Sequence, residues 1–179
     1  LTAAANMTRY AGQYYTQQQC RDLVAYAAER GVMVVPEIDM PGHSDAFKQA
    51  MGFDMQSDQG VAALKVILDE VVEVFGASPY IHIGGDEVRI TYPNFLKTMA
   101  AYVRGKGKKV LMWNRLVAGP PTAELCDMTQ MWATAGRVVD GLPNIDCRYN
   151  YTNHFDVYAD LVGIYRSNIY YTPRGTANV

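Results

Sequence analysis

Long apolar runs and concentrated positive charge are both missing from this 179-residue sequence. No apolar run approaches the roughly 20 residues that a helix needs to cross a bilayer, so we expect no membrane-spanning segment. The largest basic cluster is GKGKK at 105–109, and the formal net charge is −2. This balance provides no basic face for a phosphate backbone, which argues against nucleic acid as a partner.

Cysteine is scarce, and the first residues lack the features of a targeting sequence. The three cysteines, Cys20, Cys126 and Cys147, are widely spaced without a CxxC pair. This spacing argues against a zinc site and against a disulfide framework. The opening residues LTAAANMTRY have no charged segment before an apolar stretch. We therefore interpret them as an internal part of a longer chain and not as a signal peptide.

Helical and strand patterns alternate along the sequence. Residues 16–31 predict a helix with Thr16 as its N-cap, Gln19 completing a capping box and Gly31 at its end. The following run VMVVPEID, residues 32–39, is short, apolar and β-branched. Such a run is typical of a strand that is buried on both faces.

The order of a helix followed by a strand is repeated toward the C-terminus. The further predicted elements are a helix at 61–76, a strand from Tyr80, a helix at 92–107, and strands at 109–114, 128–132 and 145–153. The segment 115–127 is too rich in proline for a full helix, and a helical period resumes at 155–165. The alternation predicts one α/β domain over residues 1–179 with a parallel sheet, either a (β/α)8 barrel or an open doubly wound sheet.

Polar and aromatic residues gather where the predicted strands end, and this favours the barrel. They are Asp39, Asp86 with Glu87, Trp113, Trp132, and Tyr151 with Asn153. A (β/α)8 barrel builds its active site on that rim, whereas an open sheet uses only its switch point. Strand periodicity also places His82, Gly84 and Asp86 on one face, while Ile81 and Ile83 face the helices.

Asp86 and Glu87 directly follow two glycines in YIHIGGDEV, residues 80–88. Both carboxylates serve one pocket only if the strand ends there and the backbone turns, and Gly84 and Gly85 make that turn sterically cheap. Two close carboxylates do not both ionise easily, so one pKa rises and that group can act as a general acid. This pair suits glycosidic-bond cleavage. Capping of the next helix is the structural alternative.

Trp113, Trp132 and Tyr151 are expected at neighbouring strand ends. Their rings would form walls against which the C–H faces of a sugar pack, with N–H and O–H groups free for ligand oxygens. The alternative is core packing, because barrel interiors also favour bulky residues.

The motifs PEIDMPGHSDAF (36–47) and HIGGDEV (82–88), followed by MWN and TQMW, resemble the catalytic domains of family 20 glycoside hydrolases, the β-N-acetylhexosaminidases. The resemblance covers essentially the whole chain. It implies an incomplete (β/α)8 barrel, with about five of the eight units present. It also implies a retaining exo-hydrolase of N-acetylhexosamine-terminated oligosaccharides or glycoconjugates, with no metal or organic cofactor.

The resemblance implies a role for each matching residue. Glu87 would be the general acid and later the base, and Asp86 would orient the substrate's 2-acetamido group, whose oxygen attacks the anomeric carbon. Tyr151 would donate its O–H to that oxygen, with Tyr149 as its rival for this role. Trp113 and Trp132 would line the pocket around the acetamido methyl group and the sugar.

The resemblance also implies roles for residues near Asp86 and Glu87. His43 would tune the general acid, and Asp39 would support the rim. Asn153 stands where the family more often has an aspartate that binds a sugar hydroxyl, so a gluco or galacto preference stays open. Glu37 and His82 are interpreted as buried polar residues that hold the barrel interior together.

Several alternatives remain open. The missing barrel units leave open sheet edges, which predicts either a piece of a longer enzyme or self-association through those edges. A carbohydrate-binding fragment without catalysis is the second functional hypothesis. A phosphate site at Gly84 and Gly85 is disfavoured, because two acids follow these glycines. Family analogy suggests an extracytoplasmic compartment.

Overall fold

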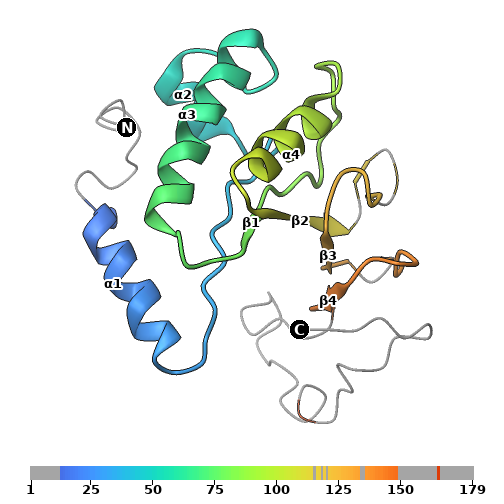
Figure 1. The fold of residues 1–179 in the computed structure, drawn as a ribbon. Helices are drawn as coiled ribbons and strands as arrows, with labels where there is room; N and C mark the ends of the chain where they lie inside the picture. Colours follow the sequence, from blue (N-terminus) through green and yellow to red (C-terminus); the bar gives the residue numbers. More distant parts are fainter. Residues whose placement is uncertain are drawn as a thin grey trace.

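The computed structural model describes residues 13–114, 116, 117, 119, 121–133, 136–148 and 165. In chain order the elements are α1 (Gln17–Ala28), α2 (Asp45–Met51), α3 (Asp58–Val74), β1 (Tyr80–His82), α4 (Phe95–Gly105), β2 (Lys109–Asn114), β3 (Met128–Met131) and β4 (Asn144–Asp146). Helices α1, α3 and α4 lie on one side of the strands (Figure 1). Helix α3 contacts both α1 and α4, and α4 contacts β2.

The four strands form one parallel sheet in the order β1-β2-β3-β4. Neighbouring strands in the sheet are therefore also neighbours in sequence, as in a (β/α)8 barrel. The parallel α/β architecture that the sequence predicts is confirmed. The predicted limits of the strand at 109–114 match those of β2.

Helix α1 begins as the sequence predicts. The Thr16 hydroxyl accepts the Gln19 N–H at 3.1 Å, and the Gln19 side chain accepts the Thr16 N–H at 2.8 Å. This reciprocal capping box satisfies two N–H groups that have no partner inside the helix. Helix α3 begins three residues earlier than predicted, because Ser57 caps it through a bond from the Gly60 N–H at 3.0 Å.

The core lies between the sheet and the helices α3 and α4. Ile81 and Ile83 are fully buried and face these helices, as the strand periodicity predicts. Further fully buried members of this core include Leu64, Leu68, Phe95, Met99, Ala100, Val103, Val110 and Met112. His82, Gly84 and Trp113 lie on the opposite face of the strands, where the candidate site described below begins.

The prediction of a strand buried on both faces over residues 32–39 is wrong: the segment forms no regular strand, and only Glu37 makes an isolated bridge, to His82. Val32 and Met33 are 57% and 54% exposed. The Val32 N–H still donates to the Ala27 carbonyl at 2.9 Å, so this residue is held against the C-terminal end of α1. Pairing with β1 begins only at Pro36, whose carbonyl accepts the His82 N–H at 2.9 Å.

Two other elements differ from the prediction. Helix α2, Asp45–Met51, lies in a segment for which the sequence indicated no helix, and Gly52 ends it with a positive φ of 77°. Strand β4 covers only the start of the predicted strand at 145–153. Tyr149, Tyr151 and Asn153 lie outside the described residues.

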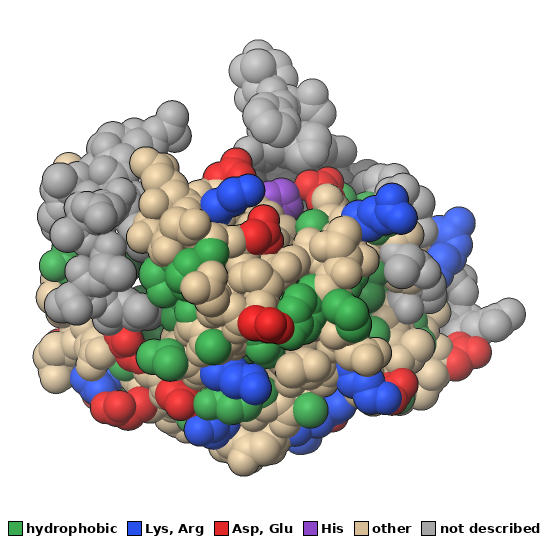
Figure 2. Space-filling model, turned by 90° about the horizontal axis from the view of Figure 1, so that it is seen from above, with side chains coloured by type: hydrophobic (Ala, Val, Ile, Leu, Met, Phe, Trp, Pro, Cys, Tyr) green, Lys and Arg blue, Asp and Glu red, His purple; other side chains and the backbone are tan. Residues whose placement is uncertain are grey.

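On the face in Figure 2, acidic and basic side chains are interspersed among apolar ones. Within the described part of the chain, every helix is too short or too polar to cross a membrane.

A chain of buried polar side chains links β2, β3 and β4. Asn114 Nδ2 donates to Thr129 Oγ1 at 3.3 Å, and Thr129 Oγ1 donates to Asn144 Oδ1 at 3.0 Å. All three residues are at least 98% buried. Because buried polar groups are costly when unpaired, these bonds stabilise one alignment of the three strands.

We predict that Thr129→Val lowers the free energy of unfolding by about 1–3 kcal/mol, because it keeps the shape of the side chain but removes both hydrogen bonds. Thr129→Ser is the matched control, since it keeps the hydroxyl and loses only a methyl group. Urea unfolding followed by circular dichroism measures both. An equal loss for the two variants would contradict a role for the hydroxyl.

Candidate active site

The backbone turns sharply directly after β1. Gly84, Gly85 and Glu87 all have positive φ angles, of 65°, 101° and 53°. Glycine adopts such angles without a steric cost, whereas a glutamate does so rarely. The turn brings the adjacent carboxylates Asp86 and Glu87 to one side of the chain, as the sequence predicts.

His43 lies between these two carboxylates. Its Nε2 atom is 3.7 Å from Asp86 Oδ2 and 3.4 Å from Glu87 Oε2. His43 also has a positive φ, of 48°. A non-glycine residue held in this conformation is typical of functional sites. The loop at 41–44 and the turn after β1 therefore place three titratable groups in one cluster.

The two carboxylates have different surroundings. The Asp86 side chain is 12% exposed, whereas the Glu87 side chain is 54% exposed. Asp86 Oδ1 is buried and has no hydrogen-bond partner among the described residues. A buried carboxylate oxygen without a partner is costly and points to a ligand or to a further protein group.

Asp39 joins the cluster from the segment that pairs with β1. Its Oδ1 accepts the Gly85 N–H at 3.2 Å. Burial first, and then the charge of Asp86, raise the pKa of Asp39 to about 6. Asp39 thus lies close enough to Asp86 for the two carboxyl groups to influence each other.

The two glycine-containing motifs lie directly against each other. A Cβ atom on Gly84 would be 1.7 Å from Asp39 Oδ1, and one on Gly42 would be 2.8 Å from the Asp86 carbonyl oxygen. Side chains at these positions cannot be accommodated without moving the backbone. Glycine is therefore needed in both motifs for the close approach of their backbones.

A second polar cluster lies deeper in the sheet. Trp113 Nε1 donates to Glu37 Oε1 at 2.8 Å, and Glu37 Oε1 is 3.3 Å from His82 Nδ1. The rings of Trp113 and His82 meet edge to face at 4.7 Å. The predicted burial is confirmed for His82, which is 3% exposed. It is wrong for Glu37, whose side chain is 37% exposed because it extends from the edge segment.

His82 is held as a neutral acceptor. The Gly84 N–H donates to His82 Nδ1 at 3.0 Å. Burial lowers the pKa of His82 to about 4. The imidazole therefore supports the start of the turn without carrying a charge near neutral pH.

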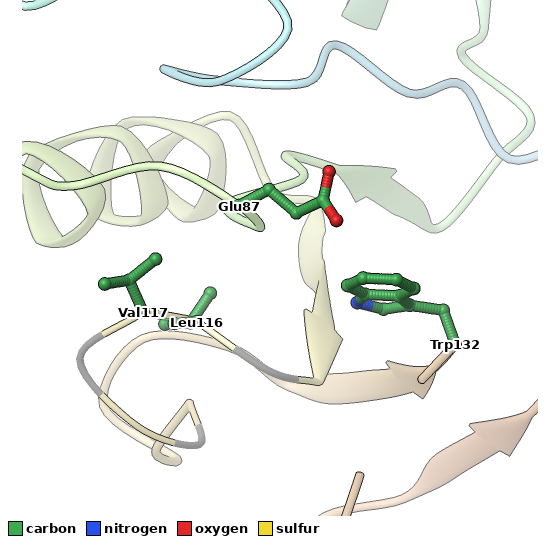
Figure 3. Close-up of a pocket in the computed structure, with 4 residues that line it drawn as sticks. All are labelled: Glu87, Leu116, Val117 and Trp132. Carbon is green, nitrogen blue, oxygen red and sulfur yellow. The ribbon is translucent and has the colours of Figure 1, made fainter. Parts of the chain in front are cut away.

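A pocket of about 410 Å3 adjoins Glu87 and is lined by Leu116, Val117 and Trp132. Figure 3 shows the Glu87 carboxylate and the Trp132 ring extending into it from different segments. Its volume lies in the range of small-molecule sites. An acid facing an indole across such a space can exchange a proton with a ligand that packs on the ring.

The structure brings together most of the predicted site residues that it describes. Asp39, His43, Asp86 and Glu87 form one cluster. Trp132 lines the pocket beside Glu87, whereas Trp113 contacts Glu37 and His82 below it. Tyr151 and Asn153 lie outside the described residues.

Leu116 and Val117 were not predicted to belong to the site. They line the pocket from the loop that follows β2. The available signal was their position directly after a predicted strand, because such loops build the active face of a barrel.

We expect Gly84→Ala to lower the free energy of unfolding far more than Gly107→Ala. Both glycines have positive φ, but a Cβ on Gly107 meets nothing within 4 Å. Gly107→Ala therefore costs only the backbone strain, about 1–2 kcal/mol. Gly84→Ala adds the clash with Asp39, about 1–3 kcal/mol more. Urea unfolding of both variants tests this, and similar losses would argue against the close packing at Gly84.

His82 gives a defined pH dependence of stability. Its pKa is 6.5 without perturbation and about 4 when folded. Between these values the unfolded chain binds a proton that the folded chain does not, so stability falls as the pH falls. From pH 7 to pH 5 we expect His82 to contribute a loss of about 2 kcal/mol.

The control is His82→Asn, which retains an acceptor for the Gly84 N–H and cannot titrate. Urea unfolding at pH 5, 6 and 7 should show a smaller loss of stability for this variant than for the unchanged protein. The same pH slope for both proteins would rule out a buried neutral His82.

The chain is similar to known proteins over much of its length. Residues 2–60 match the family described as "Glycosyl hydrolase family 20, catalytic domain". A β-hexosaminidase from Vibrio furnissii is 39% identical over 105 residues, covering 46% of this chain and 17% of that protein. A β-N-acetylhexosaminidase from Cellulomonas fimi is 32% identical over 133 residues, covering 61% of this chain and 27% of that protein. The chain thus spans less than a third of these relatives.

Solved structures share the fold. The tandem GH20 catalytic modules of the pneumococcal exo-β-D-N-acetylglucosaminidase StrH match with a TM-score of 0.60 at 16% identity, over 75% of this chain and 45% of that chain. A second StrH structure, described for inhibition and N-glycan recognition, matches with a TM-score of 0.62 at 14% identity, over 77% of this chain and 46% of that chain. The fold is therefore that of part of a (β/α)8 barrel. Over residues 2–60 the chain is similar to the catalytic domain of glycosyl hydrolase family 20.

Proposed function

We propose that this chain carries the catalytic carboxylates of a retaining exo-β-N-acetylhexosaminidase, which removes terminal N-acetylglucosamine or N-acetylgalactosamine from glycans. The observation that carries the proposal is the pairing of a buried carboxylate, Asp86, with an exposed one, Glu87, around one histidine. Two acids in different surroundings can divide the roles of charge stabilisation and proton transfer.

Glu87 is proposed as the general acid and base. Its side chain is half exposed and borders the pocket beside Trp132. In the first step it gives its proton to the glycosidic oxygen while the bond from that oxygen to the anomeric carbon breaks. In the second step the resulting carboxylate takes a proton from the attacking water. His43, 3.4 Å from Glu87 Oε2, can adjust this proton transfer.

Asp86 is proposed to act on the substrate's own acetamido group. The acetamido carbonyl oxygen attacks the anomeric carbon from the opposite side of the leaving group and forms an oxazolinium ion. Asp86 accepts the acetamido N–H and stabilises the positive charge of this ion. The buried Oδ1 atom without a described partner is suited to that bond. Water then opens the oxazolinium, so the configuration at the anomeric carbon is retained.

The aromatic residues are proposed to hold the sugar. Trp132 faces the pocket next to Glu87 (Figure 3) and can pack on a sugar ring. Trp113 is fixed by Glu37 and His82, so it can form a rigid part of the pocket floor. Tyr151 as a donor to the acetamido oxygen and Asn153 as a ligand of a sugar hydroxyl remain proposals from the family resemblance.

A second candidate is sugar binding without turnover. It is favoured by one observation: Trp132, Leu116 and Val117 line a pocket beside Glu87 that offers apolar surface to a sugar. A pocket that binds the sugar but lacks positioning groups can lose orders of magnitude in rate. Binding measured apart from turnover separates the two candidates.

The test is release of 4-nitrophenol from 4-nitrophenyl β-N-acetylglucosaminide by the purified protein. We expect Glu87→Gln to lower kcat by about 100- to 10,000-fold on substrates with poor leaving groups, because it removes the transferable proton. Asp86→Asn should lower kcat on all leaving groups. Glu29→Gln, an exposed glutamate at the end of α1, is the matched control and should leave activity unchanged.

Calorimetric titration with the N-acetylglucosamine thiazoline completes the test, since this compound imitates the oxazolinium. Binding by both the unchanged protein and Glu87→Gln, together with turnover by the former alone, supports the enzyme. Binding without turnover supports the second candidate. Full activity of Glu87→Gln on a poor leaving group would refute the role of Glu87.

A further inference from the structure

Three side chains of the site offer ligand atoms to a common point. One oxygen from Asp39, one oxygen from Asp86 and one imidazole nitrogen from His43 lie within 4.8 Å of one another. The His43 Nε2 to Asp86 Oδ2 distance is 3.7 Å. Two ligands of one tetrahedral zinc ion are about 3.4 Å apart, given bonds of about 2.1 Å. Only a small movement of the exposed imidazole is needed to complete this geometry.

The Asp86 carboxylate points independently to a ligand at this place. Asp86 is 92% buried, and its Oδ1 atom has no hydrogen-bond partner among the described residues. Asp39 uses one oxygen to accept the Gly85 N–H. Asp39 and Asp86 thus place two carboxylates close together, beside the His43 imidazole. No lysine or arginine contacts them among the described residues. A bound cation would therefore reduce the repulsion between the two carboxylates.

The cluster is open to solvent on the histidine side. The His43 side chain is 54% exposed. Figure 2 shows histidine surface between acidic side chains on the outside of the molecule. An ion can therefore reach the carboxylates without unfolding of the segment.

We propose that Asp39, His43 and Asp86 bind one divalent transition-metal ion of the Zn2+ type and that this ion inhibits the enzyme. Imidazole with two carboxylates suits zinc better than magnesium or calcium, which take oxygen ligands almost exclusively. The bound ion occupies Asp86, which then cannot accept the acetamido N–H. It also draws His43 away from Glu87. Binding of the metal stands by itself, whereas inhibition rests on the proposed function.

Metal binding is tested by calorimetric titration of the purified protein with ZnCl2 at pH 7. We expect binding of one ion per chain and a loss of affinity of about 10-fold or more in Asp39→Asn and in His43→Gly. His43→Gly suits the positive φ at this position, and Asp39→Asn retains an acceptor for the Gly85 N–H. Both variants should therefore fold, which circular dichroism verifies.

Two controls exclude other sites. Asp22→Asn removes an exposed charge on α1 and should bind zinc as the unchanged protein does. Titration with Co2+ reports the ligand type, because thiolates give an intense near-ultraviolet band that imidazole and carboxylates lack. A thiolate band, or unchanged affinity in folded Asp39→Asn and His43→Gly, overturns the proposed site.

Inhibition is measured on 4-nitrophenyl β-N-acetylglucosaminide. We expect zinc to raise the apparent KM and EDTA to restore it. Zinc binding at the site without an effect on turnover overturns the inhibitory role. One-to-one zinc binding in a protein that shows no hydrolysis supports the metal site and refutes the proposed function, so the two failures are distinguishable.

Discussion

The bond from the Gly85 N–H to the Asp39 carboxylate connects the two halves of the site. Asp39 belongs to the segment that pairs with β1, and Gly85 belongs to the turn that ends it. The bond forms only because Gly84 has no Cβ that would occupy the place of the Asp39 oxygen. The positions of Asp86 and Glu87 follow from this turn. Asp39, a partly buried acid, thus holds the turn in place, and the exposed Glu87 depends on that turn for its position.

Much of this arrangement could be predicted from local patterns. Strand β2 was predicted with its observed limits, because a short apolar run bounded by glycine and lysine has few alternatives. The capping box of Thr16 and Gln19 fixes the start of α1 through atoms three residues apart. The approach of Asp86 and Glu87 was predicted because two glycines permit a turn that other residues resist.

The remaining features depend on contacts between distant segments. Helix α2 has only 7 residues, too few for a clear helical period, so its sequence carries a weak signal. The exposure of Glu37 follows from its place on a segment that pairs on one side with β1. The raised pKa of Asp39 arises from burial and from Asp86, 47 positions away in the sequence. The side-chain periodicity within one strand predicts neither the exposure of Glu37 nor the raised pKa of Asp39.

The hydrogen-bonded chain of Asn114, Thr129 and Asn144 has a consequence on the far side of the sheet. Slippage of one strand by a single residue would turn every side chain to the other face. These buried groups fix the register of β2, β3 and β4. They thereby fix the positions of Trp113 and Trp132 along the strands on the inner face. The positions of the aromatic rings thus depend on two side-chain amides and one hydroxyl that lie on the opposite face of the sheet. Substitutions of Asn114, Thr129 or Asn144 would therefore shift the two rings and weaken ligand binding, although none of the three residues lies on the inner face.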